Sequence, residues 1–583
     1  MEDRGYTLDG TVDLSGRPVL SSSTGKRKAC AFILAYQAFE RFAYFGVSAN
    51  LVIYMTSELH KDLVSSVTGV NYWSGTAWIT PVLGAYLADS FLGRFWTITF
   101  ALLIYAIGMG LLVITTSLRC FRTVCTNGIC REASSLRQTL FYLSIYTIAI
   151  GSGVLKPNMS TFGADQFDDF KLKEKELKVS FFNWWSFNTS CGTLAATLFV
   201  VYIQERFGWG LGYGISSIGF MLASFTFFMG VPIYRHKSRQ GKSHAEEFFR
   251  VPVVAFRNRK LQLPSSPSEL HELELEHYND SGKRQIYHTP RFRFLDKAAI
   301  KESKEGTTNP PCTVSQVETN KLILGMLVIW LLIIIPSNFW AVEVTVFVKQ
   351  GTTMERNLGP NFKIPAASLW SFVVATMLIC LPIYDHYFVP FMRRRTGYHR
   401  GIKMLQRIGI GVAIQVIAAA VMYAVEILRM NVIKKKHIVG AEEIVPMSIF
   451  WLLPQHVLLG FANTFLMAGL LEFFYDQSPE EMKVLGTAFY TSTIAAGKYS
   501  NSLLVTAIDK FTRKISGKSW IGNNLNDCHL DYYYALLFVI SALNFGVFLW
   551  VSSGYVYKKE STTKVNDIEI LREMQTETLV GKA

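Results

Sequence analysis

The 583-residue chain contains few charged residues and few cysteines for its length. Asp, Glu, Lys and Arg together make up 17% of it, which excludes a disordered or coiled-coil chain. Its eight cysteines are too sparse for a disulfide-stabilised scaffold, no Cys-x-x-Cys pair occurs, and the eleven histidines lack metal-ligand spacing. We therefore expect neither a bound metal nor a cofactor.

Four of the cysteines leave one question open. Cys120, Cys125 and Cys130 share a short loop, and Cys528 lies in another loop that the predicted topology puts on the same side. This grouping is compatible with a disulfide and equally with free thiols.

Apolar residues are abundant instead. Hydrophobic side chains make up 50% of the chain and the mean hydropathy is +0.23. The formal net charge of +14 would suit a nucleic-acid binder, but the excess Lys and Arg lie in clusters between long apolar runs. The composition predicts an integral membrane protein with basic loops at the lipid bilayer surface and no nucleic-acid partner.

Apolar runs of about 18 or more residues recur roughly twelve times. They centre on residues 30–55, 69–92, 95–117, 139–160, 183–205, 213–235, 321–347, 366–392, 404–427, 447–471, 484–508 and 534–557. Two groups of six spans are typical of a secondary transporter built from two six-helix halves. We expect an all-α membrane protein with a cytosolic tail at 1–29, a first half at 30–235, a cytosolic linker at 236–320, a second half at 321–557 and a cytosolic tail at 558–583.

Basic residues in the short loops set the predicted orientation. They cluster before the first span and after the second, fourth and eighth spans, which all fall on one side, although Arg119, Arg122, Arg131 and Lys434 to Lys436 fall on the other. Both termini are therefore expected in the cytosol. For this multi-pass protein we expect the plasma membrane rather than the tonoplast.

Ionisable side chains inside the apolar runs point to a polar pathway, because a charge at membrane depth needs a partner or water. In the first span Gln37, Glu40 and Arg41 share one helical face. Lys156 lies in the fourth span beside Pro157, where a helix can bend. We expect Lys156 and Glu40 to meet across the first half. The alternative is that Arg41 and Lys156 extend their charges to a membrane interface.

The second half carries fewer charges in its spans. Glu343 lies in the seventh span, where a gating carboxylate and an interfacial one are both open interpretations. The tenth span adds Gln455, His456 and Asn463. A lone His at the polar edge of a span favours a structural role.

The chain resembles the proton-coupled oligopeptide transporter superfamily, within the major facilitator fold, and more closely the plant nitrate and peptide transporter family. Within that family it looks most like the fifth subfamily. The matching motifs occur in order over nearly the whole chain: residues 6–13, Glu40-Arg41, 84–94, Lys156-Pro157, 162–168, 181–184, 471–477, Trp520-Ile521 and 524–526.

The resemblance implies proton-driven uptake by alternating access, with a Glu-x-x-Glu-Arg motif on the first helix and a Lys on the fourth. Here Gln37 replaces the first Glu, and an amide can hydrogen-bond Arg41 but cannot titrate. If proton coupling is kept, Glu40 must carry more of the cycle, helped by Glu343.

Departures from the family pattern bear on the substrate. Trp340 stands where the nitrate-binding relative has a His, and Asn463 stands where peptide carriers have the carboxylate that holds an amino terminus. Ser186 and Ser190 replace the fifth-helix Tyr and Asn of the peptide signature. Dipeptides, and nitrate bound in the known manner, are both weakened as substrates.

The first hypothesis is therefore a symporter that takes protons and a small organic or anionic solute, of the nitrate, peptide or specialised-metabolite class. Lys156 and Arg41 would supply positive charge, Trp340, Tyr44 and Tyr72 the stacking walls, and Gln455 and Asn463 polar contacts. The alternatives are an uncoupled facilitator or exchanger and a solute sensor that does not transport. No nucleophile elbow, phosphate loop or His-rich cluster predicts an enzyme. The sequence does not determine the oligomeric state.

Overall fold

In the computed structural model, residues 6–7, 9–118, 125–126, 129–130, 134–168, 170–237, 245–264, 266–274, 285–301, 311–397, 401–441, 443–478 and 483–558 are described. The chain forms two compact units. The first consists of Met1–Lys242, Trp330–Phe473 and Thr487–Ser552, and the second of Ser243–Ile329, Phe474–Gly486 and Ser553–Ala583.

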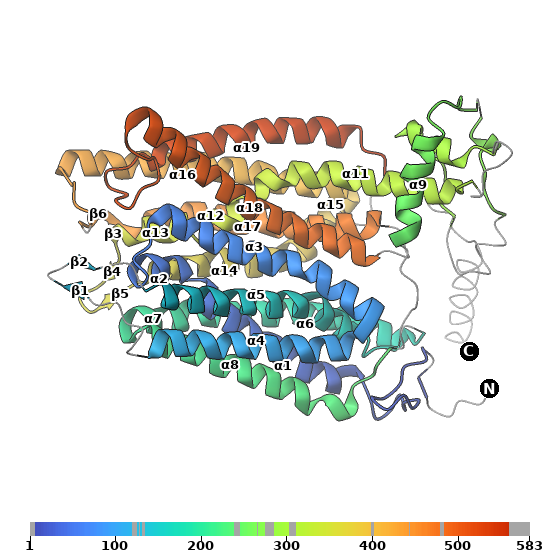
Figure 1. Cartoon of the computed structure of the whole chain (residues 1–583), viewed down its shortest axis with the longest axis horizontal. Helices are drawn as coiled ribbons and strands as arrows, with labels where there is room; N and C mark the ends of the chain where they lie inside the picture. Colours follow the sequence, from blue (N-terminus) through green and yellow to red (C-terminus); the bar gives the residue numbers. More distant parts are fainter. Residues whose placement is uncertain are drawn as a thin grey trace. The chain divides into compact units, whose positions relative to one another are not determined.

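The first six-helix half is built from long helices joined by short breaks (Figure 1). Its elements are α1 (Lys26–Ser48), α2 (Leu51–Ser57), α3 (Leu63–Leu87), the π-turn η1 (Ala88–Leu92), α4 (Arg94–Ser117), α5 (Ser135–Ala164), α6 (Leu172–Ala195), the π-turn η3 (Ala196–Val200), α7 (Val201–Phe207), α8 (Trp209–Met229) and the 3₁₀ turn η4 (Val231–Ile233). Asp62 and Ser134 cap α3 and α5 by accepting backbone N–H groups of the first turn. Gly93 precedes α4 with φ at 77°, a conformation that favours glycine.

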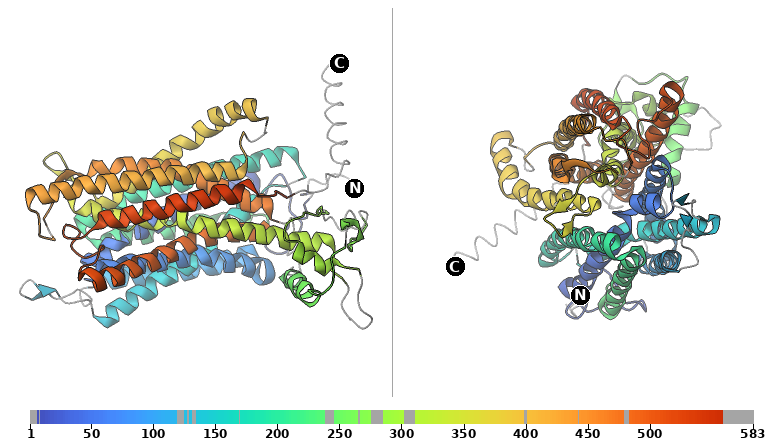
Figure 2. Two further views of the ribbon diagram at one scale, coloured as in Figure 1. Left: turned by 90° about the horizontal axis from the view of Figure 1, so that it is seen from above. Right: turned by 90° about the vertical axis from the view of Figure 1, so that its left-hand side faces the viewer.

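The second half repeats this pattern with more interruptions. Its elements are α11 (Val314–Ser337), α12 (Phe339–Val342), α13 (Val346–Thr352), η7 (Ala366–Leu369), α14 (Trp370–Ile383), η8 (Tyr384–Phe388), α15 (Val389–Thr396), α16 (Met404–Lys436), η9 (Ile449–Leu452), α17 (Leu453–Gln477), α18 (Lys483–Ser516) and α19 (Leu530–Ser553). In Figure 2 (right) many of the long helices are seen nearly end-on, as in a bundle.

Nine helices in the described part of the chain are long and apolar enough to cross a membrane. They coincide with nine of the twelve predicted spans. The other three spans fall on α1, α3 and α18, which have 23, 25 and 34 residues but are more polar. The count of twelve therefore depends on three helices that carry polar side chains into the bundle.

Two predicted spans are broken rather than continuous. The run 30–55 is α1 and α2, which are separated at Ala49 and Asn50. The run 321–347 is interrupted after Ser337. Pro336 contributes there because it has no N–H for the carbonyl of Leu332, and Asn544 of α19 donates to that carbonyl instead, at 3.0 Å.

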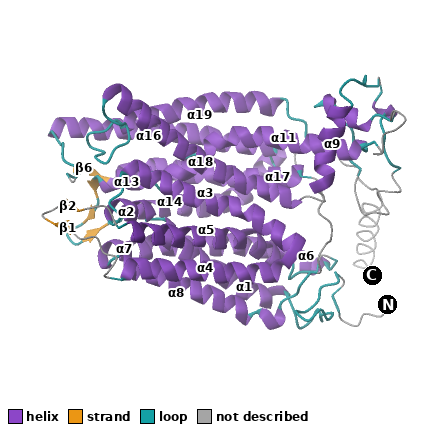
Figure 3. Cartoon of the chain, viewed as in Figure 1, coloured by secondary structure: helices purple, strands orange, loops and turns teal. Residues whose placement is uncertain are grey.

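Short strands lie together at one end of the first unit (Figure 3). β1 (Cys125–Thr126) pairs antiparallel with β2 (Ile129–Cys130), β4 (Asn357–Leu358) pairs antiparallel with β5 (Phe362–Lys363), and β3 (Met354–Glu355) pairs parallel with β6 (Val445–Ser448). This end is the predicted outer side, and we call it the strand end.

The cysteine question is answered in part. Cys528 is a buried free thiol whose pKa is raised by burial. The backbones of Cys125 and Cys130 face each other in register. Cys120 lies outside the described residues.

Hydrogen bonds join the two halves near the strand end. The backbone N–H of Leu63 donates to Asn523 at 2.7 Å, and Ser368 donates to the carbonyl of Thr197 at 2.8 Å. Arg356 forms an ion pair with Glu205 at 2.9 Å. In Figure 1, α2, α7 and α13 lie at this same end. The two halves are therefore held together at the predicted outer side.

The second unit contains most of the predicted linker. It is built from α9 (Ala245–Arg257), the 3₁₀ turns η5 (Pro267–Glu269) and η6 (Arg293–Ala299), and the first turns of α11. A small core forms around Val251, Leu295 and Val317. The polar linker thus folds around an apolar centre of its own.

Candidate functional site

The first helix places a buried ion pair inside the first half. Glu40 and Arg41 of α1 are 1% and 8% exposed, and Arg41 bonds the Oε2 atom of Glu40 at 2.5 Å. Gln37 donates to the hydroxyl of Thr189 on α6 at 2.8 Å, and not to a partner on its own helix. Among the described residues, no group donates to the Oε1 atom of Glu40. One carboxylate oxygen therefore carries the ion pair and the other is unpartnered.

Lys156 is held by a backbone carbonyl and two aromatic rings. Pro81 of α3 lacks an N–H for the carbonyl of Ala77, and the Lys156 ammonium donates to that carbonyl at 3.1 Å. The ammonium lies 4.2 Å from the centre of the Trp78 ring and 4.8 Å from that of Tyr44. In the described part of the chain no carboxylate bonds Lys156, so the expected contact with Glu40 is electrostatic and not direct.

Tyr44 connects the two cations of the first half. The Arg41 guanidinium lies 5.1 Å from the centre of the Tyr44 ring, and Lys156 faces the same ring. The Tyr44 ring also stacks on that of Trp73, with ring centres 5.7 Å apart. The neighbouring Phe45 packs against Trp370 of the second half, with ring centres 4.9 Å apart. Cation–π attraction stabilises such positions when they are desolvated. Aromatic contacts therefore link the first-half charges to the second half.

In the second half a hydrogen-bond chain surrounds Glu343. Its carboxylate accepts from the Trp370 indole at 3.0 Å and from the Asn463 amide at 3.1 Å. The Trp340 indole in turn donates to Asn463 at 2.8 Å. Glu343 is 2% exposed, so it is enclosed by protein and is not an interfacial carboxylate.

Lys498 of α18 completes this group and was missed by the sequence reasoning. It is 5% exposed, donates to the carbonyl of Trp340 at 3.1 Å, and interacts electrostatically with Glu343 and Lys156. A lysine inside the predicted run 484–508 was the signal that could have identified it. Trp78 and Trp370 were also missed, because an aromatic side chain in an apolar span is unremarkable in sequence.

Two predicted binding residues lie apart from these hydrogen bonds. Tyr72 is 39% exposed and packs near Tyr499, with ring centres 6.0 Å apart. Gln455 is fully buried, and its amide bonds no described residue. The Nδ1 atom of His456 donates to the Leu452 carbonyl at 2.7 Å, which fits the structural role expected for it.

The charges of the group can be counted. Arg41, Lys156 and Lys498 are three cations, and Glu40 and Glu343 are two anions, so the fully ionised group carries +1. Each carboxylate that takes up a proton raises the net charge of the group by one. We call these five residues the central charge group.

A separate ion-pair cluster fixes the predicted cytosolic ends of the first-half helices. Arg94 pairs with Asp165. Arg235 pairs with Glu174 at 2.8 Å. Burial by itself raises the pKa of Glu174, but hydrogen bonds from the Asp168 N–H and from Arg235 outweigh it, so the pKa lies below its ordinary value.

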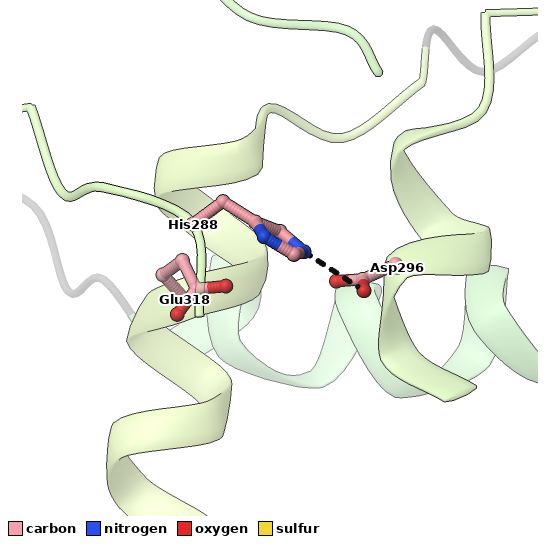
Figure 4. A group of neighbouring side chains, drawn as sticks. All are labelled: His288, Asp296 and Glu318. Carbon is pink, nitrogen blue, oxygen red and sulfur yellow. Dashed lines mark hydrogen bonds and ion pairs between the residues drawn. The ribbon is translucent and has the colours of Figure 1, made fainter. Parts of the chain in front are cut away.

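The second unit brings three potential metal ligands together, which sequence spacing did not indicate. His288, Asp296 and Glu318 have ligand atoms within 4.8 Å of one another (Figure 4). The Lys321 ammonium, however, lies 2.7 Å from both Asp296 and Glu318. Glu318 also accepts the Thr289 hydroxyl at 2.7 Å. An internal cation therefore already pairs with both carboxylates, and the cluster is explained as an ion-pair network that fastens the linker to α11.

Comparison with known proteins places the chain in a family. Residues 95–521 match the pattern of PTR2, the POT family. The chain is 57% identical over 559 residues to Protein NRT1/PTR FAMILY 5.1 of Arabidopsis thaliana, covering 96% of this chain and 95% of that protein. It is 43% identical to Protein NRT1/PTR FAMILY 5.2 of the same plant, with 97% of each covered.

A solved structure agrees on the fold. The crystal structure of an auto-inhibited POT family peptide transporter superimposes with a TM-score of 0.67 at 19% identity, covering 91% of this chain and 97% of that one. At that identity the likeness shows the major facilitator fold alone. Together with the matches above, it makes the chain a multi-pass membrane transporter and not an enzyme. The chain belongs to the POT family of proton-coupled transporters and is similar to members of its fifth plant NRT1/PTR subfamily.

Proposed function

We propose that the protein is a proton symporter for a small anionic organic solute and that the central charge group does the coupling. The observation that carries the proposal is the buried Glu40–Arg41 pair. Arg41 and Lys156 both form cation–π contacts with the ring of Tyr44. A buried acid bonded to one cation and close to a second can release both when it takes up a proton.

Protonation has a defined position at Glu40. Its Oε1 atom accepts no hydrogen bond from a described residue, so a proton added there breaks no existing bond. The proton removes the charge that holds Arg41. Arg41 and the neighbouring Lys156 then attract an anionic group of the solute.

Glu343 is the second titratable group of the cycle. Gln37 cannot titrate, so a transporter that lacks the first motif carboxylate needs a substitute or runs with one proton site fewer. Glu343 is buried among the side chains of Trp370, Asn463 and Lys498 and belongs to the other half. Its protonation and solute binding would therefore act on both halves, which is what alternating access requires.

The charge balance favours an anion over a cation. Asn463 is neutral and uses its amide to join Trp340 to Glu343, and the charge of Glu343 is offset by Lys498. A peptide ammonium therefore finds no uncompensated carboxylate there, whereas the Lys156 ammonium is a cation that, among the described residues, hydrogen-bonds the Ala77 carbonyl and no carboxylate.

The test is an uptake screen in oocytes at pH 5.5 and 7.5 with nitrate, dipeptides, amino acids, hormones and organic acids. We expect one anionic solute to accumulate faster at pH 5.5. Glu40→Gln should abolish this uptake, and Lys510→Gln, an exposed lysine of α18, serves as the matched control. Uptake by Glu40→Gln that is still faster at pH 5.5 than at pH 7.5, as in the parent, would refute proton coupling through Glu40.

An uncoupled facilitator or exchanger is the second candidate, and the Gln37–Thr189 hydrogen bond favours it because a titratable position is occupied by a neutral amide. A solute sensor is the third. Voltage clamp with recording of internal pH separates them at a fixed membrane potential. Solute-dependent acidification of the oocyte interior supports symport, because a proton carried with a monoanion lowers internal pH even when no net charge moves. Uptake insensitive to pH supports the facilitator, and binding without accumulation supports the sensor. Immunolocalisation tests the plasma membrane against the tonoplast.

A further inference from the structure

Helix α18 brings Lys498 to the interruption in the seventh helix. Gly497 allows this approach, because a Cβ atom there would lie 2.3 Å from the Ser337 side chain and 2.6 Å from its backbone carbon. The close contact puts Lys498 beside the short helix α12, where its ammonium reaches the Trp340 carbonyl. The position of this cation is therefore fixed by backbone packing.

Two charged residues of the described chain, Glu343 and Lys156, interact electrostatically with Lys498. Glu343 attracts it, and Lys156 of the first half repels it. Its only hydrogen bond among the described residues goes to a neutral carbonyl. When Glu343 takes up a proton, the nearby negative charge disappears and the repulsion between the two lysines remains.

We propose that Lys498 is a solute-binding residue that holds a carboxylate of the solute once Glu343 is protonated. Lys156 and Lys498 then hold the solute from opposite halves, and its negative charge offsets their repulsion. This inference rests on the proposed function and adds to it the solute class, a carboxylate, and the second-half group that recognises it.

A purely structural role makes a different prediction. If Lys498 served only to neutralise Glu343 and support the Trp340 carbonyl, its replacement would lower stability without changing the affinity for a carboxylate. If it binds solute, replacement weakens carboxylate binding by about tenfold or more, as expected for one charge-assisted hydrogen bond.

Equilibrium binding to the purified full chain in detergent separates the two roles. Succinate is the probe, succinamide is its uncharged control, and the readout is the apparent dissociation constant from thermal unfolding at pH 5.5 and 7.5. We expect succinate but not succinamide to bind, and more tightly at pH 5.5. Lys498→Gln should bind succinate about tenfold more weakly, Lys498→Arg within about threefold of the parent, and Lys510→Gln like the parent.

The succinate affinity of Glu343→Gln is a second, independent test of the proposal. The substitution removes the competing charge permanently, so the variant should bind succinate more tightly than the parent at pH 7.5. This variant keeps the test valid if Lys498→Gln does not fold. Unchanged succinate affinity in Lys498→Gln, or a Glu343→Gln variant that stays as weak as the parent at pH 7.5, would overturn the inference. So would absence of succinate binding by the parent.

The outcomes also separate this inference from the proposed function. Proton-driven uptake that depends on Glu40, with succinate affinity lost in Lys156→Gln but kept in Lys498→Gln, leaves the symporter intact and removes only Lys498 as a ligand. Succinate binding that depends on Lys498, found together with no proton-driven uptake, keeps Lys498 as a ligand and removes the symporter.

Discussion

The strongest stability prediction concerns a fully buried ion pair on α16. Glu426 and Arg429 are both 0% exposed and bond each other at 2.7 Å. Arg429 also donates to Asn526 at 3.0 Å and to the Leu525 carbonyl at 2.8 Å, and Gln350 donates to Glu426 at 2.6 Å. The pair therefore fastens α16 to α13 and to the loop before α19.

Replacing Arg429 with Met should be severely destabilising. It leaves the Glu426 carboxylate buried with, among the described residues, only the Gln350 amide as a side-chain donor, and breaking one side of a buried ion pair costs about 3–5 kcal/mol. The matched control is Arg513→Met on α18, an exposed i,i+4 partner of Asp509 whose loss should cost about 0.5 kcal/mol or less.

Thermal unfolding of the purified full chain measures the effect. We expect a large fall in the midpoint for Arg429→Met, almost none for Arg513→Met, and partial recovery when Glu426→Gln is added to Arg429→Met, because the unpaired charge is then removed. Equal midpoints for the two arginine variants would refute the reasoning. A double variant no more stable than Arg429→Met would show that the loss comes from packing and not from an orphaned charge.

Three further predictions follow from other contacts. Pro81→Ala restores an N–H that competes with the ammonium of Lys156, so uptake should fall severalfold in oocytes while surface expression stays constant. Lys321→Met removes the ammonium that Asp296 and Glu318 share, so limited proteolysis of the second unit should be faster than in the exposed control Lys301→Met. Because the folded-state pKa of Glu174 is lowered, its stabilisation should be present above its ordinary pKa and lost as pH falls through the folded value. The stability gap between the parent and Glu174→Gln should therefore be constant from pH 5 to 8 and shrink below about pH 4.5.

Hydropathy identified nine of the spans because membrane-crossing segments are long and locally apolar, and both properties can be read from a continuous stretch of sequence. The same rule marked Glu40, Arg41, Lys156 and Glu343, since ionisable residues stand out against apolar neighbours. The ordered motifs were sufficient to indicate the family, which the comparisons confirm.

The sequence did not predict the helix ends or the hydrogen-bond partners of the polar side chains. Two helix breaks, between α1 and α2 and after Ser337, do not interrupt the apolar runs. Hydropathy therefore did not detect them. Gln37 bonds Thr189 and not Arg41, and Lys156 bonds a carbonyl and not Glu40. Each of these outcomes depends on a neighbouring helix that the local sequence does not contain.

The sequence by itself determined that the chain is built from long apolar helices and which of them carry charge. Only the tertiary structure decided which charges share a site. Lys498 and Glu343 are 155 positions apart, and Lys156 lies 342 positions before Lys498, yet helix packing makes their charges interact. Composition and spacing along one helix are local quantities, whereas the balance of cations and carboxylates inside the bundle is set by how separate helices pack, with close approaches such as that of Gly497 to Ser337 fixing the positions.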